Sequence, residues 1–301
     1  MAEHGTGPGA PSGGGALDAR LAAVEGSQDP RDWNELGCDL SDAGRLGEAE
    51  ACFRRAVALG ASWVEFNLGN TLRDLGRTEE ARGAYERAVA AGEDDALLNL
   101  GLLHRDEGRV EQARAVLETA VAAGEPAAHV PLGDLDHDDG DDEGAELHYR
   151  AGLQAGDPAG AGALGVLLAE RGRDGQAEPL LRAAAPHDPE ARAALGTLLR
   201  RTGRLAEAQQ VLEAGVGAGE RQSCLPLGNL LWDEHGDLAG AEAAYRRAVA
   251  AGDDFGHHNL GLLLWETGRR EEAAEQFRLG AAAGDAMAAA ALAELVDGRG
   301  G

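Results

Sequence analysis

The stretch LGNTLRDLGRTEEARGAYERAVAAGE occupies residues 68–93, and LGLLHRDEGRVEQARAVLETAVAAGE follows it at residues 100–125. Glycines, alanines and large side chains stand at the same offsets in both stretches, although most of the other residues differ. Self-similarity at a fixed period of roughly 20–50 residues is the signature of a repeat protein, and a missed repeat leads to the wrong fold. The number of copies therefore decides the architecture.

The glycine of the Leu-Gly pair marks one copy of the repeat. It recurs at Gly37, Gly69, Gly101, Gly133, Gly165, Gly196, Gly228 and Gly261. Successive marker glycines are 32 residues apart, except for 31 before Gly196 and 33 before Gly261. A ninth copy begins at Leu292, where Ala293 replaces the glycine. The sequence therefore predicts eight repeats in tandem.

Each repeat carries the pattern of two helices. A second glycine follows the marker by seven residues, or by eight in the seventh repeat; an alanine comes five residues later and a large side chain four residues after that. Apolar residues at steps of three and four mark one face of a helix. A glycine between two such runs ends the first helix and lets the chain turn. Each repeat is therefore predicted to be a helical hairpin whose apolar face needs a neighbouring repeat to cover it.

These residues resemble the tetratricopeptide repeat, which also combines Leu-Gly, glycine, alanine, an aromatic and a small residue at such offsets. The connections AAGEDDALLNLG at 90–101 and AAGDDFGHHNLG at 250–261 resemble those of Sel1-like repeats, a related family of helical hairpins. The period is shorter than the roughly 34 residues of tetratricopeptide repeats. The resemblance covers residues 30–296 and implies an all-α, right-handed superhelical solenoid of about eight hairpins that binds proteins.

Four segments are expected along the chain. Residues 1–15 are predicted to be a flexible tail rich in glycine and proline, residues 16–29 an N-terminal capping helix, residues 30–285 the eight repeats, and residues 286–301 a C-terminal capping helix and tail. Solenoids need such caps to cover their last apolar faces. No basic segment precedes an apolar run at the start, so no secretory signal is expected. The sequence contains no run of 18 apolar residues, so no membrane span is predicted.

The composition constrains the partner. The 27 basic residues, all of them arginine, face 53 acidic ones, and the formal net charge is −26. This balance argues against nucleic acid and against anionic membrane surfaces, and it favours another protein or a peptide that is neutral to basic. Three scattered cysteines argue against a disulfide scaffold and indicate a cytoplasmic protein. No cofactor is predicted, and the oligomeric state stays open.

The fifth repeat is the least regular one. Gly160 and Gly162 fall inside its first helix, and Pro179 falls inside its second. Because proline beyond the first turn removes a hydrogen bond and clashes with the preceding turn, the second helix is expected to start late. Two interpretations stay open: sequence drift in a tolerant repeat, or a soft joint near residues 155–190.

An acidic stretch is the strongest candidate for chemistry. Seven acids fall within residues 134–143, and Asp134, Asp136 and Asp138 alternate as in a calcium-binding EF-hand loop. The glycine that such a loop needs comes one residue late, its closing glutamate is missing, and the repeat places residues 134–139 on a helix. A solvated acidic face is the favoured interpretation. Weak divalent-ion binding, or a metal-dependent enzyme using His137, remains as the alternative.

The first helices are expected to line the inner wall that holds a ligand, by analogy with tetratricopeptide arrays. Positions one, four and five after each marker glycine project there. Trp232 and Trp265 occupy position four in consecutive repeats, where they either contact a partner or pack against neighbouring helices. The candidate partner-binding residues are Asn70, Arg73, Asn99, Arg105, His137, Asn229, Trp232, His258, Leu262 and Trp265.

The predicted function is a non-catalytic protein- or peptide-binding scaffold. Asn70 and Asn99 match two positions of the carboxylate clamp found in some tetratricopeptide arrays, although its lysines are absent here. No nucleophile elbow, phosphate-binding loop or zinc-protease motif is present. A ligand-sensing subunit that regulates an enzyme or a transcription factor is the main alternative.

Overall fold

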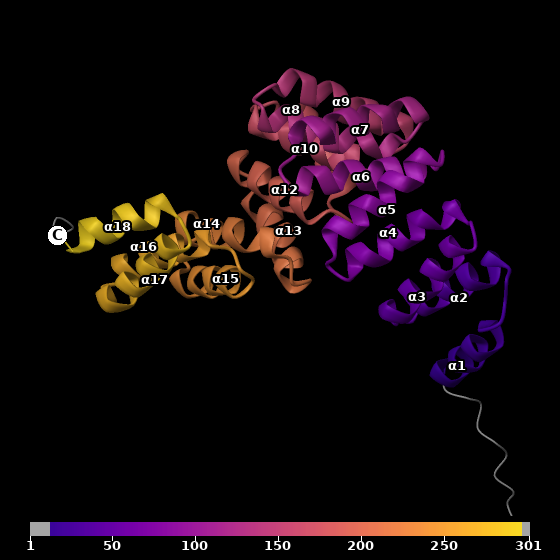
Figure 1. The fold of residues 1–301 in the computed structure, drawn as a ribbon. Coiled ribbons are helices and arrows are strands. Elements are labelled where there is room, and N and C mark those ends of the chain that lie inside the picture. Colours follow the sequence, from indigo (N-terminus) through magenta and orange to yellow (C-terminus); the bar gives the residue numbers. More distant parts are fainter. Residues whose placement is uncertain (1–12, 297–301) are drawn as a thin grey trace, which may run out of the picture. The chain divides into compact units, whose positions relative to one another are not determined.

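The computed structural model describes residues 13–296, and these residues form eighteen α-helices and three short 3-10 helices without a strand among them (Figure 1). The first helices of the eight repeats are α2 (Pro30–Asp42), α4 (Glu65–Asp74), α6 (Asp95–Asp106), α8 (His129–Asp138), α10 (Ala159–Glu170), α12 (Pro189–Arg201), α14 (Cys224–Asp233) and α16 (Phe255–Glu266). The second helices are α3 (Leu46–Ala58), α5 (Thr78–Ala90), α7 (Val110–Ala123), α9 (Asp142–Ala155), α11 (Asp174–Ala184), α13 (Leu205–Gly217), α15 (Leu238–Ala250) and α17 (Arg270–Ala282). The 3-10 helices η1 (Ser62–Val64), η2 (Pro126–Ala128) and η3 (Arg221–Ser223) lead into first helices. The expected all-α hairpin solenoid is thus confirmed.

Two further helices flank the repeats. Helix α1 (Gly13–Val24) places Leu17, Leu21 and Val24 against the core of the first repeats. These residues precede Ala49, Phe53 and Ala56 by 32 positions, so α1 has the register of a second helix. Helix α18 (Ala286–Val296) has the register of a first helix and buries Ala288 and Ala291. The rest of the segment expected as a tail, residues 1–12, lies outside the described residues.

The marker glycine sets the distance between the two helices of a hairpin. A Cβ added at Gly69 would lie 2.6 Å from the ring of Tyr85, and one at Gly37 would meet Phe53 just as closely. Both rings are almost completely buried. Glycine is therefore required at the marker because the large side chain of the second helix occupies the space of a Cβ.

The glycine between the helices has a different role. It has a positive φ in every repeat, for example 72° at Gly44, and residues other than glycine rarely adopt this conformation. A second left-handed glycine follows the second helix in all repeats except the fifth, where Pro186 and the N-capping Asp188 form the connection. This connection is as long as the one between α5 and α6, so the period of 31 residues at this repeat has its origin in the shorter helix α11.

Pro179 lies inside α11, which begins at Asp174. The expectation that this helix starts late was therefore wrong. The proline is the sixth residue of the helix, so the hydrogen bond that it cannot donate would have gone to a carbonyl of the first turn, and the damage stays local. The helix ends at Ala184 after 11 residues, whereas most second helices have 13.

The chain divides into two compact parts, residues 1–139 and 140–301, called the N-terminal and C-terminal parts below. This boundary precedes the segment 155–190 in which a soft joint was considered. Within the C-terminal part, α10 and α11 pack closely, since a Cβ at Gly165 would meet Leu181 at 2.9 Å. Among residues 13–296, no helix combines the length and the apolar character that crossing a membrane requires.

Candidate partner-binding surface

The two asparagines of the N-terminal part come together. Asn70 accepts a hydrogen bond of 2.7 Å from the Tyr85 hydroxyl and one of 2.9 Å from the Asn99 side chain. Burial raises the pKa of Tyr85 to about 12, so this hydroxyl stays protonated and remains a donor. The Asn70 carbonyl oxygen is thus engaged in contacts within the repeat array.

The arginines predicted beside them are engaged in ion pairs. Arg105 donates to Asp134 of the next repeat at 2.9 Å. Arg73 lies 3.3 Å from Asp74, and half of its side chain is exposed. His137 lies exposed on α8. A carboxylate clamp would need positive side chains that the protein itself leaves available, and Arg105 does not meet that requirement.

The three alternating aspartates do not converge on one point. Asp134 faces Arg105, while Asp136 accepts a 2.5 Å hydrogen bond from Arg114, and Asp138 is exposed. They lie on α8, where alternate residues point in different directions. In the described part of the chain, no group of three histidine, cysteine or acidic side chains is placed to hold a metal ion.

The two tryptophans of the C-terminal part share one geometry. Trp232 lies edge-on to Tyr245 with ring centres 6.2 Å apart, and Trp265 lies edge-on to Phe277 at the same distance. Tyr245 and Phe277 are fully buried, whereas both tryptophans are half-buried. One edge of each indole therefore packs on the core of its own repeat, while the remainder faces outward. The packing interpretation describes the inner edge, and the outer part stays a candidate for contact with a partner.

The neighbouring candidates are partly occupied with packing. Asn229 accepts a 2.7 Å hydrogen bond from the Tyr245 hydroxyl, whose pKa is raised by burial. The His258 ring lies 6.1 Å from that of Phe277, and its Nδ1 has no hydrogen-bond partner among the described residues. Leu262 is half-buried on α16. Of this set, the tryptophans and Leu262 offer apolar surface, and Asn229 and His258 mainly support the buried rings.

A pocket that was not predicted from the sequence lies between two other first helices of the C-terminal part. It lies between α10 and α12, has a volume of about 210 Å³, and is lined by the apolar Val166, Ala169, Ala194 and Leu198 and by the polar Glu170, Thr197 and Arg201. Ala169 occupies position four after its marker glycine, where other repeats carry larger residues such as Arg73 and Trp232. That single small residue was the signal that could have indicated the pocket. We call Val166, Ala169, Trp232, Leu262 and Trp265, with the pocket, the apolar face.

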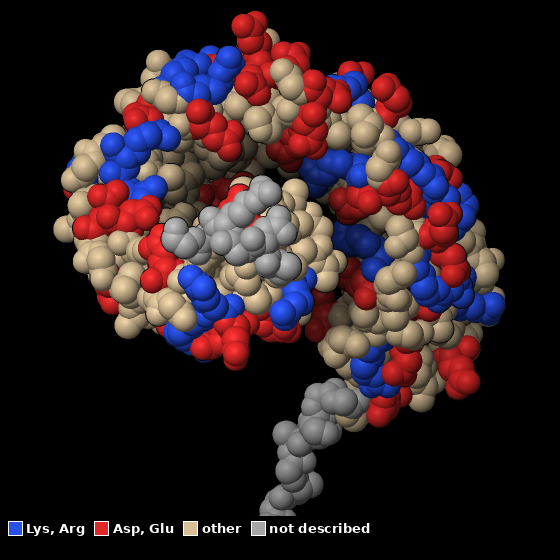
Figure 2. Space-filling model, turned by 90° about the vertical axis from the view of Figure 1, so that its left-hand side faces the viewer, with Lys and Arg blue, Asp and Glu red and all other residues tan. Residues whose placement is uncertain are grey.

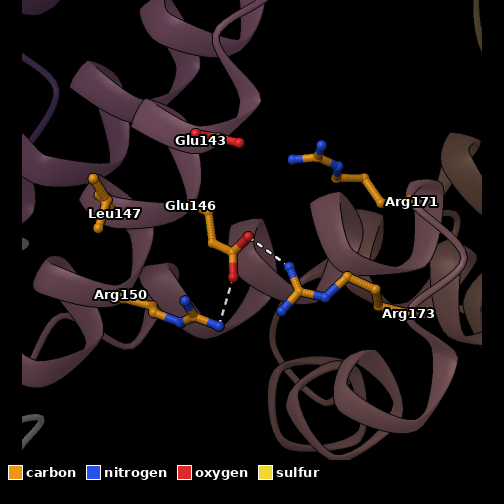
Figure 3. Close-up of a pocket in the computed structure, with 6 residues that line it drawn as sticks. All are labelled: Glu143, Glu146, Leu147, Arg150, Arg171 and Arg173. Atoms are coloured by element: carbon orange, nitrogen blue, oxygen red, sulfur yellow. Dashed lines mark hydrogen bonds and ion pairs between the residues drawn. The ribbon is translucent and has the colours of Figure 1, made fainter.

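A second, charged pocket of about 450 Å³ lies between α9 and the turn that precedes α11 (Figure 3). Glu146 accepts from Arg150 at 2.5 Å and from Arg173 at 2.6 Å, and the hydrogen bond from Arg173 lowers the pKa of Glu146. Leu147, which is 69% exposed, lies at its rim. The central carboxylate is thus ionised and saturated by arginines, so it is a poor proton donor or acceptor for catalysis.

This pocket is one member of a ladder of ion pairs between second helices. An arginine one residue after the turn glycine donates both to a glutamate three residues later and to a glutamate of the preceding second helix. The pairs are Arg77 with Glu80 and Glu50, Arg204 with Glu207 and Glu178, and Arg269 with Glu272 and Glu242. Acidic and basic side chains are correspondingly interspersed over the face seen in Figure 2. The separation of the partners by 26 or 27 residues was visible in the sequence but was not used.

The order of the charges reverses at two joints of the N-terminal part. There the second helix supplies the arginine: Arg82 contacts Glu107, and Arg114 contacts Asp139 as well as Asp136. Where the arginine after the turn glycine is missing, Asp141 and Asp237 cap the second helix by accepting from a backbone N–H. Each joint therefore has its own complementary set of charges.

These features define an all-α solenoid of helical hairpins. One tetratricopeptide-repeat profile matches residues 34–96, 66–128 and 98–161, and a second one matches residues 189–214 and 255–278. The chain belongs to the tetratricopeptide-repeat family. No curated protein matches the sequence.

Solved structures share the fold at low sequence identity. A Sel1 repeat protein from Oxalobacter formigenes is 21% identical over 98% of this chain and 97% of its own, with a TM-score of 0.56. A tetratricopeptide repeat protein from Parabacteroides merdae is 20% identical over 79% of this chain and 100% of its own, with a TM-score of 0.61. The Cut9–Hcn1 hetero-tetramer of the APC/C is 16% identical over 76% of this chain and 46% of that chain, with a TM-score of 0.56. These similarities concern the fold alone.

Proposed function

We propose that this protein is a non-catalytic scaffold that binds a segment of another protein on the apolar face of repeats five to eight. Solenoids of this family generally serve as protein-interaction modules. The Cut9–Hcn1 structure is one in which a protein of similar fold is assembled with a second protein. The scaffold acts by displaying a surface and carries out no covalent step.

The pair of tryptophans carries this proposal. Trp232 and Trp265 occupy the same register in consecutive repeats, and each is held in one orientation by a buried ring. A large side chain that is already ordered loses little conformational entropy when a partner covers it. Tryptophan is also enriched among the residues that dominate binding energy. Two ordered indoles on one face therefore suit a partner with apolar side chains.

The charges around the tryptophans favour a neutral or basic partner. Asp233 is paired with Arg200 at 2.9 Å, whereas Glu266, next to Trp265, makes no ion pair among the described residues. A basic residue beside the apolar anchor would complement Glu266. The net charge of −26 disfavours nucleic acid and anionic membranes as partners. Three free cysteines support a cytoplasmic location.

Alanine substitution of the tryptophans tests the proposal. We expect Trp232→Ala and Trp265→Ala each to weaken binding of the protein that co-purifies with this scaffold by about 1–3 kcal/mol, the range for loss of a dominant aromatic anchor. Calorimetric titration of the purified pair measures the affinity, and thermal unfolding measures the stability.

The matched control is Trp63→Ala, since Trp63 is a 39% exposed tryptophan in the N-terminal part. It should leave the affinity unchanged. If both test variants bind normally but unfold at a much lower temperature, the two tryptophans are structural and the proposed face is wrong.

A further inference from the structure

The pocket between α10 and α12 exists because one side chain is small. At position four after the marker glycine, the eight repeats carry Ser41, Arg73, Arg105, His137, Ala169, Arg200, Trp232 and Trp265. Ala169 is the smallest of these side chains, and it lines the pocket together with Val166 and Ala194. Leu198 forms the best-covered part of the lining, with 1% of its surface exposed. The opening thus coincides with the smallest side chain of this row.

The wall of this pocket is fixed in place. Arg201 lines one side, and its guanidinium donates a 2.9 Å hydrogen bond to the Ala169 carbonyl and pairs with Asp174. The Ala169 carbonyl belongs to the last turn of α10 and also accepts a 3.1 Å hydrogen bond from the Gly172 N–H. The hydrogen bond from Arg201 to the last turn of α10 therefore also positions the arginine as one side of the pocket, so the pocket is formed before a partner binds.

The size of the pocket selects the kind of occupant. Its volume of about 210 Å³ is below the roughly 300–1,000 Å³ of sites that hold drug-sized molecules. An apolar cavity of about 150 Å³ already suffices to hold a benzene ring. The volume and the apolar residues Val166, Ala194 and Leu198 therefore fit one aliphatic or phenyl group, while Glu170, Thr197 and Arg201 supply the polar part of the lining.

The pocket and Trp232 lie on consecutive first helices, because α10 and α12 line the pocket and α14 carries Trp232. Arg200, which precedes Arg201 of the pocket wall in the sequence, contacts Asp233, which follows Trp232, at 2.9 Å. A segment that covers Trp232 thus passes close to the opening.

We propose that this pocket is a side-chain subsite that takes one leucine-, methionine- or phenylalanine-like side chain of the partner, next to the part of the partner that covers Trp232. The inference rests on the proposed function, because it assigns a further anchor on the same apolar face.

Fluorobenzene, a probe of the size of one phenyl side chain, tests the subsite without the partner. We expect its ¹⁹F resonance to broaden in the presence of the full chain. The broadening should be lost with Ala169→Leu and with Ala194→Leu, which fill the pocket from opposite helices. It should persist with Ser41→Leu, which adds a leucine at the same register in the first repeat. No broadening with the unmodified protein, or equal broadening with both pocket variants, would overturn the subsite.

The co-purified partner tests whether the subsite is used. Ala169→Leu and Ala194→Leu should weaken its binding about tenfold, as expected for one lost anchor, whereas Ser41→Leu should leave the affinity unchanged. All three variants should keep the melting temperature of the original protein. If fluorobenzene binds and is blocked but the partner's affinity is unchanged, the partner does not use the pocket. If the two tryptophan variants leave the partner's affinity unchanged but the pocket variants weaken it, the proposed role of the tryptophans is wrong, whereas the pocket remains a binding subsite.

Discussion

The first helices of the N-terminal and C-terminal parts share most of their buried residues but present different outward-facing ones. In the N-terminal part the candidate side chains satisfy each other: Asn99 donates to Asn70, and Arg105 pairs with Asp134. In the C-terminal part, positions one and four after the marker include Val166, Ala169 and Trp232, which leave apolar surface and a pocket. The helices and their spacing are alike, so the fold does not cause this difference.

The comparison separates two sets of positions in the repeat. The leucine, the marker glycine, the alanine and the large side chain form the hairpin and recur in both parts. Positions one, four and five after the marker contribute little to the buried core and are free to vary. A binding surface can therefore be added to some repeats without changing the architecture of the others.

The largest expected effect comes from the positions that the two parts share. We expect Gly69→Ala in the N-terminal part and Gly261→Ala in the C-terminal part each to destabilise the protein by about 3 kcal/mol, because the new methyl group would overlap the buried rings of Tyr85 and Phe277. Urea unfolding followed by circular dichroism measures the loss.

Gly47→Ala is the matched control. Gly47 lies in α3 with no atom within 4 Å of an added Cβ, so the exchange should stabilise the helix by up to about 1 kcal/mol. A marker variant that is as stable as the original protein would show that its part does not use the glycine for close packing.

The shared positions are also the ones that the sequence predicted well. A strict period fixes them, and it also gave the bounds of α18 as 286–296. The register of Trp232 and Trp265 was predictable, but their half-burial was not, because it depends on where Tyr245 and Phe277 place their rings. The pocket was missed because it results from an absent side chain. The ion-pair ladder was missed because each pair joins two repeats. The position of Pro179 inside α11 was missed because the proline removes only one hydrogen bond, to a carbonyl of the first turn.

The N-terminal part breaks the shared core pattern at two positions. Three residues after the marker, six repeats have a buried leucine, whereas the third has His104 and the fourth has Asp136. Asp136 is paired with Arg114, but the Nδ1 of His104 is buried without a hydrogen-bond partner among the described residues. We expect His104→Leu to stabilise the protein by about 1 kcal/mol, because an unsatisfied polar atom leaves the core. The reverse exchange in the C-terminal part, Leu231→His, should destabilise it.

The same residue predicts a pH dependence. Burial lowers the pKa of His104, reinforced by Arg109 and Arg82 and opposed by Glu107 and Glu86. The folded state therefore releases the proton more readily than the unfolded chain, and stability falls as the pH drops below about 6.5, where the unfolded histidine begins to bind a proton. Melting temperatures of the original protein and of His104→Leu, measured between about pH 5 and 8, should diverge toward low pH. A constant difference would rule out His104 as the source.

The smallest expected effect concerns the ion-pair ladder, in which the charges run in opposite directions at Arg204 of the C-terminal part and at Arg114 of the N-terminal part. Arg204 of the C-terminal part contacts Glu178 and Glu207, and its hydrogen bonds lower the pKa of Glu207 to about 2. Glu207 is exposed and Glu178 is partly exposed, so water and salt screen the attraction. We expect Arg204→Ala to lower the melting temperature only slightly, and less so in high salt. The contribution should be present above the ordinary glutamate pKa and vanish as the pH falls toward 2, because Glu207 then takes up a proton.

Arg114→Ala in the N-terminal part should cost more than Arg204→Ala, since it leaves the buried Asp136 without its 2.5 Å partner. If Arg204→Ala and Arg114→Ala lower the stability equally, the orientation of the charges between two repeats, and not the burial of one partner, determines how much an ion pair contributes.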